Sequence, residues 1–440
     1  KARVVLGARS AIWLPYRNLG LVIVDEEHEP SYKQFDPAPR YHARDAAVVL
    51  ANRFGARILL GSATPSLESY YNAITIEKYA LVELKERYNN LLMPEIELVD
   101  LKDKYRRKRM TGHFSDRLIE VITETLDQKQ QVILFQNRRG FSPIIECQTC
   151  GHSPQCPNCD VSLTYHQFKN QLRCHYCGFS AAMISSCEAC GGHDLDSKGF
   201  GTQQVEEEAK ALFPEAKVAR MDLDTTRGKQ SYERIISGLE NREIDILVGT
   251  QMLTKGLDFR HVRAVGIMNA DALLNFPDFR AHERSFQLMQ QVSGRSGRTD
   301  MRGIVIIQTY NPYHRIVQQV SSYDYTGMFK DQLEDRRTYH YPPFYRLIRI
   351  TLRHKDFNKV NSGADWLVRS FRQILSAEVL GPEFPPIARI RRQYNKNILV
   401  KVGPDQSLNK TKEAILKIKN SFHSIKDFRP VRVILNVDYY

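Results

Sequence analysis

Long hydrophobic runs are missing from this sequence. No stretch approaches the ~18 to 20 apolar residues that cross a bilayer, and the opening Lys1-Ala2-Arg3-Val4 lacks the apolar stretch of a secretory signal. Internal repeats and low-complexity tracts are also absent. With 440 residues, 42% of them hydrophobic, the chain can build two or three separate cores. The sequence therefore predicts a soluble, cytoplasmic, multi-domain protein, and because residue 1 is not methionine we expect it to begin within a longer one.

Cysteine is missing outside one short region, because all eight cysteines lie between Cys147 and Cys190. Such clustering indicates metal ligands rather than disulfides. The cysteines form four Cys-x2-Cys pairs, and since each pair offers two thiolates to one tetrahedral ion, four pairs make two sites of four cysteines each. We expect two structural zinc ions, with iron–sulfur ligation or a redox dithiol as alternatives. The spacing does not say which pairs share an ion, and the expected ligands are Cys147, Cys150, Cys156, Cys159, Cys174, Cys177, Cys187 and Cys190.

Acidic residues are too few to balance the basic ones. The formal net charge is +13, and from Lys330 to Tyr440 there are 22 lysines and arginines against 11 acidic residues. A polyanion is the natural partner of such a region, although a soluble basic domain without this partner would have the same charge.

Short, fully apolar runs that each end in a polar cluster recur along the chain. Strands that are apolar on both faces are typical of parallel sheets covered by helices, and ligands bind such sheets at the carboxyl ends of the strands. Helix-length stretches lie between the runs, such as 115–128, which opens with the N-cap Ser115. The expected fold class is therefore α/β, with doubly wound parallel sheets. The expected strands are Leu21–Val24, Ile58–Leu60, Val132–Phe135, Ile246–Val248 and Ile304–Ile307.

Changes in composition divide the chain into domains. Residues 86–114 predict a linker, because 101–109 is strongly basic and has little apolar periodicity. After Asn311-Pro312, a helical stretch leads to alternating strands such as 347–352, which predicts a separate α+β domain. The expected domains are a first lobe at 1–85, the linker at 86–114, a second lobe at 115–146 and 193–325, a zinc-binding insertion at 147–192, and a C-terminal domain at 326–440.

Two motifs at strand ends suggest phosphate chemistry in the first lobe. Asp25-Glu26-Glu27-His28 follows an apolar strand, where one carboxylate could hold Mg²⁺ and the next could polarise a water that attacks a γ-phosphate. Gly61-Ser62-Ala63-Thr64-Pro65-Ser66 ends the next strand with small hydroxyl side chains that could sense phosphate. A solvated acidic turn and an ordinary strand-end turn are the alternatives.

Two further motifs lie in the second lobe. The stretch Gln291–Arg298 carries Arg295 and Arg298 three positions apart, on one face of a helical turn. The planar, permanently charged guanidinium can stabilise charge that develops during phosphoryl transfer, whereas a basic surface helix is the alternative. The stretch Gly249–Phe259 adds a strand, a polar turn and an acidic residue. Four motifs in this order are far more specific than any one of them.

The order DEEH, GSATPS, ILFQNRRGFS, GTQMLTKGLDF and QQVSGRSGR is similar to motifs II to VI of superfamily 2 helicases. Further stretches make the chain resemble the bacterial replication-restart helicases, the PriA family: Gly7–Trp13, Ser31–Gln34, Arg40–Asp45 and Asp271–Arg280. The resemblance implies two RecA-like helicase lobes, the first of them incomplete. It also implies an ATP-dependent 3′–5′ DNA helicase that binds stalled or repaired replication forks, unwinds DNA and starts primosome assembly.

The resemblance also implies roles for individual residues. Asp25 and Glu26 would serve Mg²⁺ and water activation, Arg295 and Arg298 would be arginine fingers, and Gln291 would contact nucleotide. The stretch Tyr32–Tyr41 resembles an aromatic-rich loop that couples DNA contact to ATP hydrolysis. Aromatic residues between basic ones also suit stacking on single-stranded bases, although a buried core would use them too. The remaining nucleotide-site residues would be Glu27, His28, Ser62, Thr64, Gly256 and Asp258, and the DNA-binding residues of the loop would be Tyr32, Lys33, Phe35, Arg40 and Tyr41.

Zinc pairing and partners follow from the same resemblance. It places Cys147, Cys150, Cys187 and Cys190 on one ion and the other four cysteines on the second. The basic cluster Arg389–Lys396 suits DNA or an acidic peptide, with a solvated strand edge as the alternative. The resemblance assigns Arg391, Arg392 and Lys396 to DNA or to the acidic tail of single-stranded DNA-binding protein. The expected partners are branched and single-stranded DNA, this acidic tail, and the primosome proteins that load the replicative helicase.

One helicase motif is missing, namely the glycine-rich phosphate-binding loop that ends in Lys and Ser or Thr. The sole Gly-Lys pair, Gly228-Lys229, is followed by Gln230. Without that lysine and its amide cradle, the β- and γ-phosphates lose their main contacts. We therefore expect a fragment that starts after this motif and does not hydrolyse ATP by itself, whereas the longer protein would bind ATP with Mg²⁺ and hydrolyse it. The rival functions are another DNA translocase of the superfamily, against which the cysteine-rich insertion argues, and a non-catalytic scaffold that recruits replication proteins.

Overall fold

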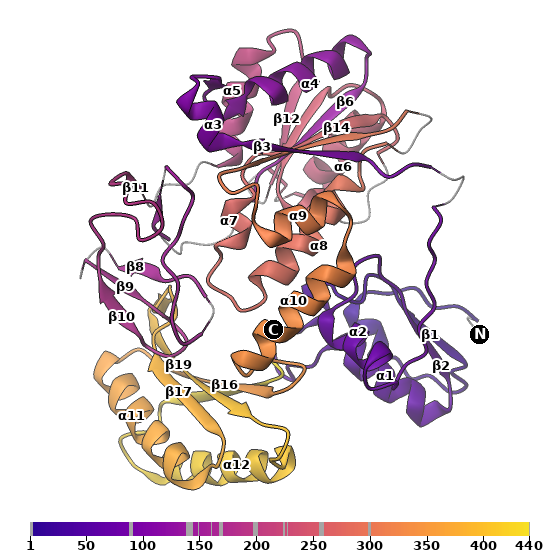
Figure 1. Cartoon of the computed structure of the whole chain (residues 1–440). Coiled ribbons are helices and arrows are strands. Elements are labelled where there is room, and N and C mark those ends of the chain that lie inside the picture. The colour runs from indigo at the N-terminus through magenta and orange to yellow at the C-terminus, as the bar shows by residue number, and fades with distance from the viewer. Residues whose placement is uncertain are drawn as a thin grey trace. The chain divides into compact units, whose positions relative to one another are not determined.

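The chain forms two compact units in a computed structural model (Figure 1). The first unit combines Lys1–Leu81 with Arg336–Tyr440, and the second is Val82–Asp335. The structure describes residues 3–87, 91–137, 144–147, 149–159, 161–166, 170–196, 201–222, 225–226, 228–254, 259–297 and 301–439. Within these ranges, no helix is both long enough and apolar enough to span a bilayer.

A six-stranded parallel sheet forms the centre of the second unit, in the order β12-β13-β6-β14-β15-β3. Strands β6 and β13 are buried along their whole length, as expected for apolar runs covered by helices. Helix α4 begins after Ser115, whose hydroxyl accepts from the Leu118 N–H and caps the helix. The α/β fold class is confirmed. The strands are β12 (Val218–Met221), β13 (Ile246–Gly249), β6 (Gln131–Phe135), β14 (Val262–Ile267), β15 (Ile304–Thr309) and β3 (Glu95–Asp100).

The predicted linker at 86–114 contains more structure than expected. Strand β3 (Glu95–Asp100) is the edge strand of the six-stranded sheet and pairs in parallel with β15. The basic stretch after it forms helix α3 (Leu101–Arg106), which Asp100 caps. The edge position explains why the pattern was missed, because Glu95-Ile96-Glu97-Leu98 alternates charge with apolar residues and so lacks a fully apolar run. The linker prediction is wrong for residues 95–106.

Other helices and short strands complete the second unit. The helices are α4 (Asp116–Asp127), α5 (Thr202–Leu212), α6 (Lys229–Glu240), α7 (Asp271–Leu274), α8 (Ala281–Ser293), α9 (Arg315–Ser321) and α10 (Tyr325–Thr338), which continues into the first unit, and η5 (Gln251–Thr254) is a 3-10 helix. The short strands β4 (Met110–Thr111) and β5 (Phe114–Ser115) pair with each other. The cysteine-rich region contains β7 (Glu146–Cys147) paired with β11 (Leu195–Asp196), and a small antiparallel sheet of β8 (Thr164–His166), β9 (Gln171–Arg173) and β10 (Ser180–Ala182).

The N-terminal part of the first unit holds two parallel strands, β1 (Leu21–Val24) and β2 (Arg57–Leu60). Helix α1 (Ala43–Phe54) packs against both strands, and α2 (Leu67–Ile74) follows β2. The 3-10 helices η1 (Arg9–Trp13) and η2 (Pro30–Tyr32) lie in the connections. The strands are less buried than their apolar sequence predicts, since Leu21, Ile23 and Leu59 are each more than half exposed.

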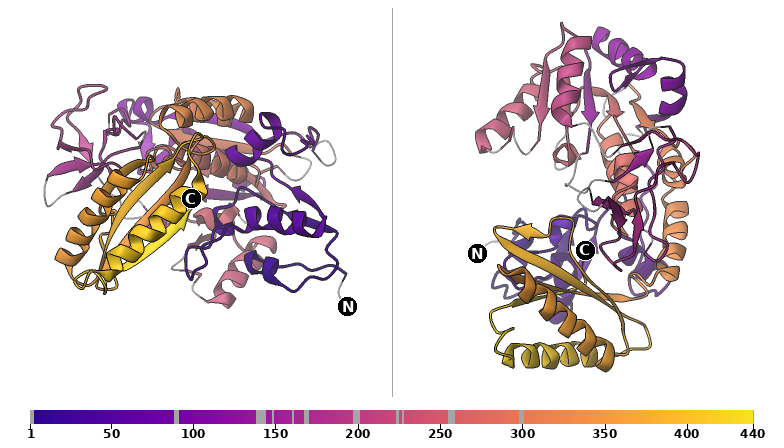
Figure 2. Two further views of the ribbon diagram at one scale, coloured as in Figure 1. Left: turned by 90° about the horizontal axis from the view of Figure 1, so that it is seen from below. Right: turned by 90° about the vertical axis from the view of Figure 1, so that its left-hand side faces the viewer.

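The C-terminal part of the first unit is an antiparallel sheet with two helices on one face (Figure 1; orange and yellow in Figure 2). Its core joins strand, helix and loop residues, including Leu352, Leu367 and Phe422. The strand expected near 347–352 is present as part of β16. The elements are β16 (Arg346–His354), α11 (Phe357–Ile374), β17 (Glu378–Glu383), β18 (Arg389–Ile390), β19 (Gln393–Val402), α12 (Leu408–Ser424) and β20 (Arg432–Val437).

Candidate metal centres and nucleotide-binding elements

The eight cysteines gather into two groups of four. One group is Cys147, Cys150, Cys187 and Cys190, and the other is Cys156, Cys159, Cys174 and Cys177. The Sγ atoms of each group lie within 4.8 Å of one another, and three of these Sγ–Sγ distances are 3.5 to 3.7 Å. Tetrahedral zinc with Zn–S bonds of ~2.3 Å requires sulfur atoms about 3.8 Å apart. Both groups therefore fit zinc, in the nested pairing that the resemblance implies.

Local backbone geometry shapes three of the four cysteine pairs for metal binding. Gly151, Gly178 and Gly191 adopt positive φ angles of 70°, 86° and 73°, which glycine reaches without a steric penalty. Their N–H groups donate to the carbonyls of the first cysteine of each pair at 2.7 to 3.1 Å. Backbone N–H groups also point at the sulfurs, as from Ala189 to Cys187 Sγ at 3.4 Å. Such donors favour the thiolate form that binds a metal ion.

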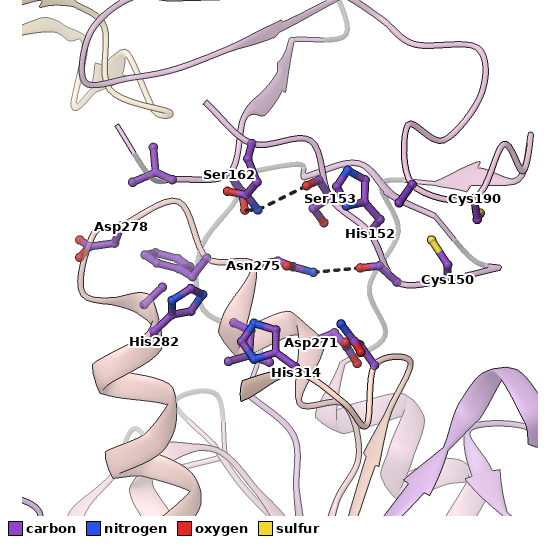
Figure 3. Close-up of a pocket in the computed structure, with 18 of the residues that line it drawn as sticks. Cys150, His152, Ser153, Ser162, Cys190, Asp271, Asn275, Asp278, His282 and His314 are labelled. Carbon is purple, nitrogen blue, oxygen red and sulfur yellow. Dashed lines mark hydrogen bonds between the residues drawn. The ribbon is translucent and has the colours of Figure 1, made fainter. Parts of the chain in front are cut away.

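The cysteine-rich module packs against the large sheet through the stretch 271–282. A Cβ at position 151 would lie 2.5 Å from Tyr310 Cβ, and Asn275 Nδ2 donates to the Gly151 carbonyl at 3.4 Å. A cavity of about 550 Å³ separates the two parts beside this contact, lined by Cys150, His152, Ser153, Asn275 and His282 among others (Figure 3). The sequence motif Asp271–Arg280 therefore forms the lobe's side of this contact, a role that its residue types alone did not indicate.

Asp271 lies at this contact and binds the end of β15 and the residue that follows it. Its carboxylate accepts from Thr309 Oγ1 at 2.9 Å and from the Tyr310 N–H at 2.8 Å. Burial raises its pKa. Burial, together with the negative charge of Asp271, also raises the pKa of Glu146 to about 8. Burial of these two groups thus makes both carboxylates costly to ionise.

Asp25 and Glu26 lie at the carboxyl end of β1, where ligands bind parallel sheets. Both are exposed, and the Asp25 carboxylate accepts from the Glu26 N–H at 3.0 Å. Glu26 has a φ of 46°, which is rare for a residue with a side chain. Tyr32 donates its hydroxyl to the Asp25 carbonyl at 2.7 Å. Burial and the nearby Asp25 carboxylate raise the pKa of Tyr32, so it remains a donor.

Glu27 has surroundings that differ from those of a ligand-binding carboxylate. It is 1% exposed, and its carboxylate pairs with Arg44 at 3.0 Å. It also accepts from the Ser66 N–H at 2.6 Å and from the hydroxyls of Ser66 and Ser69 at 3.0 and 2.8 Å. These contacts connect the end of β1 to α1 and to the first turn of α2. The geometry gives Glu27 a positioning role, and its predicted nucleotide contact stays a prediction.

His28 connects the two strand-end motifs of the first lobe. Its Nδ1 lies 2.7 Å from the Ser62 hydroxyl and 3.6 Å from a Glu26 carboxylate oxygen. Ser62 Oγ in turn accepts from the Thr64 N–H at 3.0 Å. The structure therefore brings Glu26, His28, Ser62 and Thr64 together, so a change at one strand end can reach the other.

The loop 32–41 exposes some predicted DNA contacts and buries others. Phe35 is 46% exposed, whereas Lys33 is 2% exposed. Tyr41 packs edge-on against Trp13, with ring centroids 5.0 Å apart, and Arg40 pairs with Asp36 at 3.9 Å. Lys33 Nζ donates to two carbonyls, so its predicted phosphate contact is not available in this conformation.

The second-lobe motifs lie on two elements that pack together, α8 and η5. Gln291 lies in the last turn of α8 and Arg295 follows its C-terminus, where both side chains are half-buried. Helix η5, which belongs to the stretch Gly249–Phe259, packs against α8. The predicted residues Arg298, Gly256 and Asp258 lie outside the described residues. Asp25 and Arg295 belong to different units, so their predicted convergence on one triphosphate stays a prediction.

The basic cluster of the C-terminal domain forms a hairpin tip. Arg391 and Arg392 are exposed at the two-residue turn between β18 and β19, with φ angles of 48° and 63°. Lys396, by contrast, is 9% exposed and donates to Asn361 Oδ1 at 2.8 Å. The two arginines are placed for an external ligand, whereas Lys396 is committed to an internal contact.

Protein-family models give the class of this protein first. Residues 200–300 match the helicase conserved C-terminal domain, so the chain carries a helicase lobe. Residues 156–181 match the PriA DNA helicase Cys-rich region domain, and residues 337–439 match the primosomal protein N C-terminal domain. The chain belongs to the PriA family.

Curated relatives extend this match over the whole chain. The replication restart protein PriA of Bacillus subtilis is 41% identical over 442 residues, which cover 100% of this chain and 54% of that protein. The protein of the same name from Rickettsia felis is 40% identical over 434 residues, covering 98% of this chain and 66% of that protein. The chain thus spans between about half and two thirds of the length of these relatives. A solved structure of RecG bound to a three-way DNA junction is 13% identical with a TM-score of 0.34, over 73% of this chain and 30% of that one, a likeness too slight to bear on function.

Proposed function

We propose that this chain is part of an ATP-dependent 3′–5′ DNA helicase that acts in replication restart. The observation that carries the proposal is the connected group at the ends of β1 and β2, in which exposed Asp25 and Glu26 lie beside the His28–Ser62 contact. A second support is the name of the relatives, replication restart protein PriA.

In this proposal the carboxylates divide the chemistry of ATP hydrolysis. Asp25 holds Mg²⁺ and Glu26 orients the attacking water, since both side chains are exposed at the strand end. His28 and Ser62 transmit the phosphate state between the two strand ends. Gln291, Arg295 and Arg298 act from the second lobe, where the guanidinium groups stabilise charge on the transferred phosphoryl group.

The zinc module has a structural role in the same proposal. Four thiolates per ion leave no open coordination position, so the ions hold loops in place and do not activate water. The partners are forked and single-stranded DNA, the acidic tail of single-stranded DNA-binding protein and the proteins that load the replicative helicase. The exposed Phe35, Arg391 and Arg392 are the side chains best placed for such ligands.

DNA-stimulated ATP hydrolysis tests the proposal. The 440-residue chain should bind forked DNA but show no turnover, because it lacks the phosphate-binding loop. A longer protein that carries this loop before the same sequence should hydrolyse ATP when DNA is added. In that protein Glu26→Gln should lower turnover on the order of 10²-fold or more, whereas the exposed control Glu86→Gln should not.

A non-catalytic scaffold is the competing function. It predicts that the longer wild-type protein binds DNA and replication proteins without DNA-stimulated turnover. That outcome would refute the motor. The direction of movement is tested separately, by unwinding of substrates that carry a single-stranded tail at the 3′ or the 5′ end.

A further inference from the structure

A buried lysine joins the C-terminal domain to the loop 32–41 within the first unit. Lys33 Nζ donates to the Val437 carbonyl at 2.9 Å and to the Arg40 carbonyl at 3.1 Å, and the side chain is 2% exposed. Val437 is the last residue of β20, at the far end of the sequence. A buried ammonium is costly unless it is hydrogen-bonded, and these two carbonyls accept from two of its three N–H donors. The position of β20 therefore affects the position of the loop.

A buried arginine makes a second connection between the same parts. Arg336 is 1% exposed, and its Nη1 donates to Glu68 Oε1 and to the Pro342 carbonyl, both at 3.1 Å. Beside it, the rings of Tyr71 and Phe344 meet edge to face with centroids 5.5 Å apart. Glu68 and Tyr71 both belong to α2. The C-terminal domain thus contacts the helix that follows the motif Gly61–Ser66.

Both connections lead to the carboxylates at the end of β1. Next to Lys33, Tyr32 donates to the Asp25 carbonyl at 2.7 Å. At the start of α2, the N-cap Ser66 donates to the buried Glu27 carboxylate through its N–H and its hydroxyl. Each route from the C-terminal domain to the stretch Asp25–His28 therefore consists of one buried cation and one short hydrogen-bonded segment.

We propose that the C-terminal domain controls the nucleotide-sensing elements of the first lobe through Lys33 and Arg336. Both are positioning residues that connect it to the loop 32–41 and to α2. A ligand of the C-terminal domain that favours one position of β20 then changes how rigidly the segment Asp25–His28 is held. The reverse also holds, because coupling between two sites is reciprocal. The meaning of this coupling for ATP hydrolysis rests on the proposed function, but the coupling itself does not.

Hydrogen exchange on the zinc-loaded 440-residue chain tests the coupling. Lys33→Met keeps the apolar stem and removes the donor to both carbonyls, and the exposed Lys355→Met is the matched control. We expect amides in 26–42 to exchange about tenfold faster or more in Lys33→Met. Amides in 432–437 should exchange faster as well, and neither segment should change in Lys355→Met. Faster exchange in 26–42 alone would overturn the proposal, because it would mark Lys33 as a residue of local importance only.

A second measurement keeps the test decisive if Lys33→Met fails to fold. In the wild-type chain, the Lys33 amino group should react with an acylating reagent at least about tenfold more slowly than that of Lys355, as its burial requires. Equal reaction rates would refute the connection to β20. Both measurements use no nucleotide, so absence of ATPase activity in the longer protein would count against the motor and leave this result standing.

Discussion

At the scale of single residues, neighbours in one motif have opposite surroundings. The side chain of Glu26 is 48% exposed, whereas that of Glu27 is buried against Arg44. The sequence predicted a carboxylate site at this strand end, but not which carboxylate faces outward. The partners of Glu27 lie 17 to 42 positions away, on α1 and at the start of α2, so no local pattern reveals them. The same holds for Lys33, whose partner Val437 is 404 positions away.

Removing the Glu27 carboxylate should destabilise the first unit. Glu27→Ala takes from Arg44 its buried carboxylate partner, leaving the half-exposed Asp45 at 2.8 Å, and takes an acceptor from Ser66, which should lower the free energy of unfolding by about 3 kcal/mol. Glu26→Ala, at an exposed position, should change it by less than about 1 kcal/mol. Urea unfolding followed by circular dichroism measures both variants. An equal loss of unfolding free energy in both variants would show that the buried contacts of Glu27 contribute no extra stability.

Acid should destabilise the second unit through His314. Burial, with the nearby His282 and Arg315, lowers the pKa of His314 to about 4. Its neutral Nδ1 accepts from the Ile316 N–H and caps α9. Because the folded pKa lies below the unfolded value of about 6.5, stability is full above that pH and falls between pH 6.5 and 4 by up to about 3 kcal/mol. Thermal unfolding of His314→Asn, which can still cap the helix, should lose stability less steeply over this range.

At the scale of elements, the apolar runs predicted β6, β13 and β15, but not the edge strands β12 and β3 or the buried central strand β14, whose run Arg263 interrupts. Every apolar run that was expected to form a strand does so, since a run such as Val132–Phe135 can be buried on both faces only inside a sheet. Strand β3 was missed because Glu95 and Glu97 occupy one face of the strand, so its sequence is not apolar on both faces. Strands β1 and β2 were predicted correctly, but parts of them are exposed. An apolar run therefore predicts that a strand forms, but it does not predict which elements cover the strand.

The hairpin between β18 and β19 should gain stability when its tip is replaced. A two-residue turn with positive φ at both positions favours Asn-Gly, and arginine there costs on the order of 1 kcal/mol for each residue. Arg391→Asn with Arg392→Gly should therefore raise the free energy of unfolding by about 1 to 2 kcal/mol. Thermal unfolding of the chain measures this gain.

The same double variant tests what the strained arginines do. If they contact phosphates, single-stranded DNA should bind more weakly, and the slope of log affinity against log salt should fall by up to about 1.4. Fluorescence anisotropy with an oligothymidylate at several salt concentrations gives both quantities. Unchanged affinity and slope would remove Arg391 and Arg392 from the DNA-binding residues.

At the scale of the whole molecule, the two metal centres have unequal consequences because they are nested. The outer group, Cys147, Cys150, Cys187 and Cys190, closes both ends of the insertion and includes the segment that contacts Asn275. The inner group closes the shorter segment between Cys156 and Cys177. The wild-type chain should therefore contain about two zinc ions, and either Cys187→Ser or Cys174→Ser should retain about one.

The two cysteine variants should differ in how far their effect spreads. Loss of the outer ion frees Gly151 from its tight turn against Tyr310, so amides in 271–282 should exchange faster in Cys187→Ser. Loss of the inner ion leaves that turn closed, so the same amides should be unchanged in Cys174→Ser. The first unit contains no cysteine and should unfold at the same urea concentration in both variants. Zinc analysis and hydrogen exchange measure both effects. If either single variant loses both ions, the two cysteine groups fold as one unit, and the predicted difference between the two variants is wrong.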